Sequence, residues 1–132
     1  MTDRPLASSP ELFADRCLGK VTIRRLRQRG WIIHLFDEVF VDDGQQVSDE
    51  EWVAYAGQRG WAGLTKDKRI RRQPAYRSAS TPIFALSNGH ISIQDIVEWF
   101  SDAEDRILRE AGNGRREFWM VYQGGRIERR EP

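Results

Sequence analysis

Four acidic residues lie where carboxylates from distant parts of the chain could act together. Asp15 and Asp67 each follow a short apolar run, and Asp49 with Glu50 opens a predicted helix between them. Carboxylate oxygens suit Mg²⁺ and Mn²⁺ as ligands, and such ions activate water and stabilise the charge that develops on a phosphodiester. We therefore take these four residues as candidate catalytic residues and metal ligands.

The surrounding elements predict how these carboxylates would meet. Two stretches, 18–29 and 48–57, have the spacing of amphipathic helices, and they alternate with buried strands predicted at 11–14, 31–36 and 61–65. The order β-α-β-α-β implies a parallel sheet with helices on its faces. Ligands of such sheets bind outside the carboxyl ends of the strands, where Asp15 and Asp67 would lie. Further along, strands are predicted at 82–86 and 118–122, and the longest helix at 92–111.

Each acidic residue also has an ordinary structural interpretation. An aspartate after a strand is commonly a turn former, and Asp49, Glu50 or Glu51 could simply cap a helix. The choice of ligand among these three neighbours stays open. Their joint placement favours a site, because clustered carboxylates repel one another unless a cation or protons lie between them.

Composition and length indicate an ordinary globular chain. The sequence has 132 residues, 39% hydrophobic and 31% charged, so we expect one domain over 1–132 with a loose segment at 1–10. A net charge of +1 does not by itself indicate a nucleic-acid partner. Cys17 is the only cysteine, which excludes an internal disulfide, and we expect it to be buried. We find no apolar membrane span or secretory signal, so we expect a cytoplasmic protein without membrane contact.

Basic residues gather next to the acidic ones in the sequence. A basic rim around an acidic centre would suit a site that grips and cuts a phosphate backbone, although a solvated charged loop has the same composition. Tyr76 could stack on a base or pack against the protein, and His34 and His90 stand alone without a zinc or triad pattern. The candidate RNA-binding residues are Arg16, Lys66, Lys68, Arg69, Arg71 and Arg72.

Three segments, 13–16, 48–56 and 60–68, together resemble the PIN-domain family, in particular its compact VapC-like branch of toxin ribonucleases. The shared pattern is an aspartate that ends the first strand, an acidic residue that opens a central helix with small residues at intervals, and the motif Thr65-Lys66-Asp67. The resemblance covers 13–72 well and the rest by its order of elements. It implies a PIN-like three-layer α/β/α sandwich with a mostly parallel central sheet of about five strands.

The same resemblance implies a function. It points to a metal-dependent endoribonuclease, the toxin of a type II toxin–antitoxin system, with Mg²⁺ or Mn²⁺ held by Asp15, by Asp49 or Glu50, and by Asp67. The Thr65 hydroxyl would support the site by holding a metal-bound water, or would only cap the strand end. Many PIN domains carry a fourth acidic residue shortly after this motif, whereas this chain has the basic run 68–72. Whether one or two metals bind therefore stays open.

Partners and competing functions follow from these patterns. The substrate would be RNA, and we expect a small DNA-binding antitoxin to cover apolar surface near the 92–111 helix and the rim of the acidic cleft; a homodimer is a further option. The main alternative is a catalytically inactive PIN-like RNA-binding or regulatory module, which the missing fourth acid favours. A phosphotransfer receiver domain fits less well, because a single aspartate follows the first strand, and a haloacid-type phosphatase would need Asp-x-Asp there.

Overall fold

The structure, a computed structural model, describes residues 9–77 and 79–131, and its central feature is a six-stranded sheet. The strand order is β2-β1-β3-β4-β5-β6, parallel from β2 to β5 and antiparallel only between β5 and β6. The predicted α/β class is confirmed, with six strands rather than five, while most of the segment expected to be loose, residues 1–8, lies outside the described residues. The strands are β1 (Glu11–Ala14), β2 (Ile32–His34), β3 (Ala62–Thr65), β4 (Ile83–Leu86), β5 (Phe118–Val121) and β6 (Ile127–Arg130).

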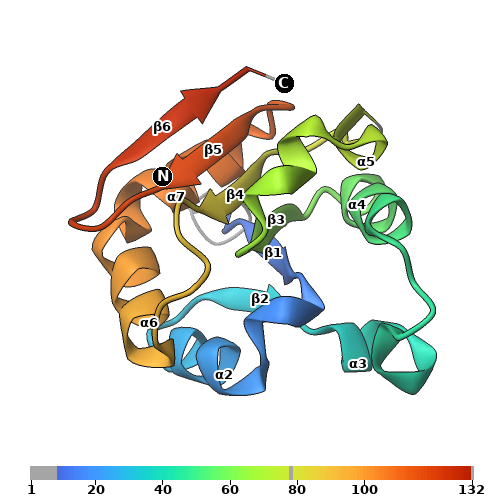
Figure 1. Ribbon diagram of the computed structural model, residues 1–132, viewed down its shortest axis with the longest axis horizontal. Helices are drawn as coiled ribbons and strands as arrows, with labels where there is room; N and C mark the ends of the chain where they lie inside the picture. Colours follow the sequence, from blue (N-terminus) through green and yellow to red (C-terminus); the bar gives the residue numbers. More distant parts are fainter. Residues whose placement is uncertain (1–8, 78, 132) are drawn as a thin grey trace, which may run out of the picture.

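Helices cover both faces of this sheet and complete the three layers (Figure 1). Alternate strand residues point to opposite faces, so each face has its own apolar core. One core packs against α2 (Lys20–Gln28), α6 (Ile93–Asp102) and α7 (Glu104–Asn113). The other packs against α3 (Phe36–Val39), α4 (Asp49–Gln58), α5 (Pro74–Arg77) and the 3-10 helix η3 (Lys68–Arg72). Two more 3-10 helices are η1 (Arg16–Leu18) and η2 (Val41–Gly44).

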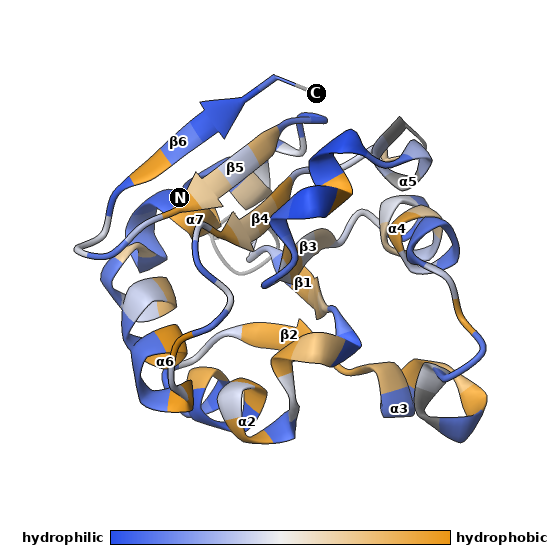
Figure 2. Ribbon diagram, viewed as in Figure 1, coloured by the Kyte–Doolittle hydropathy of each residue, from blue (hydrophilic) through white to orange (hydrophobic). Residues whose placement is uncertain are grey.

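Two predicted elements differ from the observed ones, and one observed strand was not predicted. The helix expected at 92–111 is two helices that meet at Ala103, and the strand expected at 31–36 is shorter because Phe36 already begins α3. The charged segment after residue 125, for which no element was predicted, forms β6. Its charges hid the strand pattern, since only Ile127 is buried while Arg129 pairs across the ladder with Glu117 at 3.1 Å. Figure 2 shows β6 as a mostly hydrophilic outer strand beside the apolar centre of the sheet.

The topology places one edge of the sheet in position for a site. From β1 the chain moves to β2 on one side, and later returns to β3 on the other side of β1. Where the strand order reverses, the connections leave a crevice at the carboxyl ends of the strands. This switch point lies between β1 and β3, the strands that precede Asp15 and Asp67.

The N-terminus of α4 is fixed locally. The Ser48 hydroxyl accepts a hydrogen bond from the Glu51 amide at 3.1 Å, and the Glu51 carboxylate accepts one from the Ser48 amide at 2.9 Å. This reciprocal capping box determines where the helix begins and makes Asp49 its first residue. Within the described residues, no helix has the length and apolar character needed to cross a membrane.

Candidate active site

Three of the four candidate carboxylates meet at the switch point. The Asp15 amide donates to the Leu64 carbonyl at 2.8 Å, which fixes the end of β1 beside the end of β3. Asp15, Asp49 and Asp67 line one pocket of about 400 Å³, together with Arg16 and Cys17. Residues from three separate segments are thus brought together, as the topology predicted.

Glu50 and Glu51 occupy different surroundings from Asp49. Glu50 is exposed and does not line the pocket, and the carboxylate of Glu51 is used by the capping box with Ser48. Of the three neighbouring acids between which the sequence left the choice open, Asp49 therefore has the position that suits a ligand.

Asp15 is the most buried of these carboxylates, with only 9% of the residue exposed. It accepts hydrogen bonds from the Thr65 hydroxyl at 2.8 Å and from the Cys17 thiol at 3.3 Å. Burial raises its pKa above the ordinary value; these two hydrogen bonds oppose the shift, and the nearby charge of Asp49 adds to it. A cation in the pocket would offset the cost of ionising this group.

Thr65 connects the ends of the two strands. Its hydroxyl is fully buried, donates to Asp15, and accepts a hydrogen bond from the Asp67 amide at 3.0 Å. A hydroxyl engaged in both directions fixes the relative positions of Asp15 and Asp67. This geometry favours a supporting role through Asp15 over direct contact with a metal-bound water.

Asp67 differs from Asp15 because it has a cationic partner. The Arg69 guanidinium donates from Nε to Asp67 Oδ1 at 2.9 Å and from Nη2 to Oδ2 at 3.1 Å, and the Arg69 amide also donates to Oδ1. The bond to Arg69 lowers the pKa of Asp67 below its ordinary value, despite partial burial. The charge of Asp67 is therefore balanced by a cation of the protein itself, Arg69.

Asp49 is held by a residue whose role the sequence did not reveal. The Trp52 indole Nε1 donates to Asp49 Oδ1 at 3.0 Å, and Trp52 is otherwise buried in the core. Residues three apart lie on the same face of a helix, so the spacing could have indicated this contact.

The candidate RNA-binding residues do not all lie at the acidic pocket. Arg16 lines it, and the cations of 66–69 line a second pocket beside it. Arg71 instead donates to the Glu131 carbonyl at 2.7 Å, and Arg72 is exposed and lines neither pocket.

One expectation about a single residue is corrected, for Cys17, and one open choice is decided, for Tyr76. Cys17 is exposed rather than buried in the core, although its sulfur lies by Asp15 and Thr65. Burial of the sulfur and the Asp15 charge raise the pKa of Cys17 to about 11, so the thiol is protonated at neutral pH and unsuited to nucleophilic attack. Tyr76 is buried edge-on against Phe118, which leaves its ring unavailable to a base.

The chemistry of the donor set suits a hard divalent cation, but the described side chains do not form one coordination site as they are placed. Three carboxylates around one pocket are the oxygen ligands that Mg²⁺ or Mn²⁺ would use. As the described side chains are placed, no three His, Cys, Asp or Glu residues are close enough together to hold an ion. Asp67 is turned to Arg69, so it would have to exchange that partner for the metal.

Comparison with known proteins places this fold and pocket in a family. Residues 10–88 match the family described as "PIN like domain", and the chain belongs to that family. The chain is also 36% identical, over 112 residues, to a protein of Mycobacterium tuberculosis named "Putative ribonuclease VapC45". The aligned region covers 80% of this chain and 81% of that relative. No solved structure matches the chain significantly.

Proposed function

We propose that this protein is a metal-dependent endoribonuclease, the toxin of a type II toxin–antitoxin system that acts in the cytoplasm. The observation that carries the proposal is the meeting of Asp15, Asp49 and Asp67 in one pocket at the switch point of the sheet. The relative named as a ribonuclease, aligned over most of both chains, supports RNA as the substrate.

Asp15, Asp49 and Asp67 would hold Mg²⁺ or Mn²⁺ as the ligands. When bound, the ion would supply an activated water and stabilise the charge on the scissile phosphate. The protein residues prepare this site. Thr65 orients the Asp15 carboxylate, and Trp52 orients that of Asp49.

Arg69 has two roles in this proposal. In the metal-free protein it neutralises Asp67 through a bidentate pair. If Asp67 turned to a metal, the guanidinium would become available to a phosphate of the RNA, for which its planar fork is suited.

An antitoxin would cover the surface beside the pocket. Val21 and Ile93 are partly exposed apolar residues, 39% and 45% accessible, near the beginnings of α2 and α6. These helices pack against each other, and both begin near the carboxyl edge of the sheet, since they follow β1 and β4. A small DNA-binding protein that carries an apolar segment would fit here. A homodimer stays a prediction, for which light scattering after size exclusion is the test.

The second candidate function is a catalytically inactive module of the same family that binds RNA. Two observations favour it. The basic run 68–72 stands where many PIN domains have a fourth acidic residue. The Asp67 carboxylate is already paired with Arg69. Measured turnover separates the two functions.

The deciding experiment is cleavage of a fluorophore–quencher RNA in Mn²⁺, in Mg²⁺ and in EDTA. The proposal expects metal-dependent cleavage by the parent protein and none by Asp15→Asn. Cleavage that survives both EDTA and Asp15→Asn comes from a contaminant or from another site, and it contradicts the proposal. RNA binding without turnover in either metal supports the inactive module.

A further inference from the structure

A second pocket adjoins the acidic one on the side of β4. It has a volume of about 710 Å³ and lies between two loops, residues 66–69 after β3 and residues 87–90 after β4. Cys17 and Asp67 line both pockets, so the two are neighbours along the carboxyl edge of the sheet. A chain that crosses the acidic pocket could therefore continue into this second pocket.

The two loops that form its walls are held in a defined arrangement. Lys68 Nζ donates to the Ser87 carbonyl at 3.1 Å, which ties the first loop to the second. Gly89 lies so close to the first loop that an added Cβ would come within 2.6 Å of the Lys66 carbonyl oxygen. Such a contact requires glycine, because a backbone atom cannot move aside as the end of a flexible side chain can. The pocket is thus a built feature of the fold.

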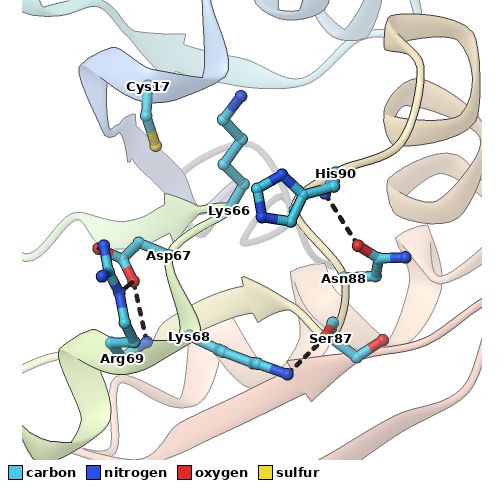
Figure 3. A pocket seen from close by; sticks show the side chains of 9 residues that line it. Cys17, Lys66, Asp67, Lys68, Arg69, Ser87, Asn88 and His90 are labelled. Atoms are coloured by element: carbon cyan, nitrogen blue, oxygen red, sulfur yellow. Dashed lines mark hydrogen bonds and ion pairs between the residues drawn. The ribbon is translucent and has the colours of Figure 1, made fainter.

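The walls offer two kinds of chemistry (Figure 3). The loop after β3 provides the cations Lys66 and Arg69 beside the shared Asp67, which suits a phosphate next to the acidic pocket. The loop after β4 provides Asn88 and His90, and the His90 amide donates to Asn88 Oδ1 at 2.9 Å. An amide group and an imidazole can bond to the edge of a nucleobase, and the imidazole can also stack on its face.

The size of the pocket and its place in the fold indicate the ligand. Its volume is within the range of about 300–1,000 Å³ that is usual for small-molecule sites, so a single nucleotide fits. A base can enter a space between two loops only after it has left a helical stack, which favours single-stranded RNA.

We propose that this pocket binds one unpaired nucleotide of the RNA substrate, the neighbour of the nucleotide at the scissile phosphate. Lys66 contacts its phosphate, and Asn88 and His90 contact its base. The inference rests on the proposed function for its choice of RNA, and it adds a subsite whose second wall, at 87–90, is separate from the acidic residues.

The test measures binding without cleavage. A short fluorescein-labelled single-stranded RNA is titrated by anisotropy in EDTA against the parent protein, Lys66→Gln and His90→Ala. Loss of one contact should raise the Kd for RNA roughly tenfold in each variant. Lys66→Gln should also reduce the slope of log K against log salt concentration by about one, because one phosphate contact is lost. Thermal unfolding confirms that the variants are folded, which we expect because neither side chain lies in an apolar core.

Arg115→Gln is the matched control for lost charge. Arg115 is exposed and precedes β5, so it lies at the amino edge of the parallel strands, opposite the pockets. Its Kd should stay within about twofold of the parent value, since long-range charge effects are screened by salt. A duplex of the same sequence should bind more weakly than the single strand and should not respond to His90→Ala.

Each outcome decides the inference. Parental Kd values for both Lys66→Gln and His90→Ala overturn the subsite, as does an equal loss in Arg115→Gln. Equal affinity for duplex and single strand, with the same response to His90→Ala, overturns the unpaired nucleotide. A parent protein that binds no RNA overturns the subsite and the choice of RNA together. If only the pocket variants lose RNA affinity, and the parent protein cleaves no RNA in Mn²⁺, the subsite is supported. The proposed catalytic function then fails by itself.

Discussion

The acidic pocket and the pocket beside it are neighbours built on different principles. In the acidic pocket, buried groups fix the carboxylates: the Thr65 hydroxyl holds Asp15, and the Trp52 indole holds Asp49. In the second pocket, main-chain approach and one lysine contact fix two loops, whose longer side chains extend into solvent.

The acidic pocket thus holds its side chains in one geometry, whereas the side chains of the second pocket can adjust to a ligand. A hydrolytic site needs its ligands in one geometry, which buried hydrogen bonds provide at a cost in stability when a partner is lost. A surface that follows a flexible RNA strand can use exposed cations whose individual contributions are small. Substitutions in the acidic pocket should thus change stability and chemistry together, and those in the second pocket should change mainly affinity.

The largest effect is expected for Asp15→Asn. Cleavage should fall more than about a hundredfold. Loss of a residue that only hydrogen-bonds a metal ligand costs about 10–100-fold, and loss of the ligand itself should cost more. The metal-free variant should nevertheless be more stable at neutral pH, by on the order of 1 kcal/mol, since the buried carboxylate is costly to ionise. Activity assays and urea unfolding measure the two effects.

The sign of the stability effect follows from the raised pKa of Asp15. The folded state holds this proton more tightly than the unfolded chain, so ionisation destabilises the folded state as pH rises above the ordinary value of 3.8. The gain in Asp15→Asn should therefore vanish below that pH and be complete above the raised pKa. Asp105→Asn, in the exposed first turn of α7, is the control and should retain parental cleavage. A metal-free Asp15→Asn variant that is less stable at neutral pH would contradict this account.

Thr65→Val should have the next largest effect. The change keeps the shape of the side chain but removes the shorter of the two side-chain hydrogen bonds to Asp15, so that only the Cys17 thiol still donates from a side chain. It also leaves the Asp67 amide without an acceptor. We expect a loss of about 1–3 kcal/mol in stability from the unsatisfied buried groups, and a fall in cleavage of about 10–100-fold. Thr65→Ser retains the hydroxyl and should recover most of the activity. Equal activity in the Val and Ser variants would show that the hydroxyl does not position the site.

Arg69→Gln tests the competition for Asp67. Removing the guanidinium should free the carboxylate, so Mn²⁺ should bind several-fold more tightly. RNA binding in EDTA should weaken, because the Asp67 charge beside the RNA is then no longer neutralised. The metal-induced rise in melting temperature reports the affinity, because a ligand specific for the folded state stabilises it. Arg72→Gln, in the same 3-10 helix, removes an equal charge outside both pockets and should leave the metal response unchanged. If both variants show the same metal response, Arg69 does not compete with the ion.

The smallest fall in cleavage is expected for Trp52→Phe. It keeps an aromatic ring in the core but removes the indole donor to Asp49, so cleavage should fall about tenfold, the lower limit for an outer partner. Stability should fall by about 1–3 kcal/mol, because the smaller ring leaves a gap in a packed core. Metal titration followed by cleavage at saturating Mn²⁺ separates weakened binding from misplaced chemistry. Parental metal affinity together with parental cleavage would argue against a role for Trp52 in holding Asp49.

Much of the fold could be predicted because most strands have a clear apolar sequence pattern. The buried runs that end at Ala14 and Thr65 are short and apolar, and their order with the helices fixes a parallel sheet. β6 could not be predicted, since three of its four residues are charged and its place depends on pairing with β5. The break at Ala103 was hidden because apolar spacing continues across it.

The placement of the candidate residues could be predicted, but their interactions could not. Topology alone brought Asp15 and Asp67 to one edge of the sheet, and capping chemistry placed Asp49 at the start of α4. The pairing of Asp67 with Arg69 depends on how the chain turns after β3, and nothing in the sequence separates it from a solvated basic loop. The second pocket depends on the close approach of Gly89 to Lys66. These residues lie in two different loops, and local sequence patterns do not predict contacts between loops.

The most direct test of the central claim is a crystal of this protein grown with Mn²⁺ and measured at the manganese absorption edge. The account predicts an anomalous peak in the acidic pocket, within roughly 2.0–2.3 Å of oxygens from Asp15, Asp49 and Asp67. It also predicts that Arg69 has released Asp67. A peak bound by other residues, or Asp67 still paired with Arg69 while the metal is bound elsewhere, would contradict it.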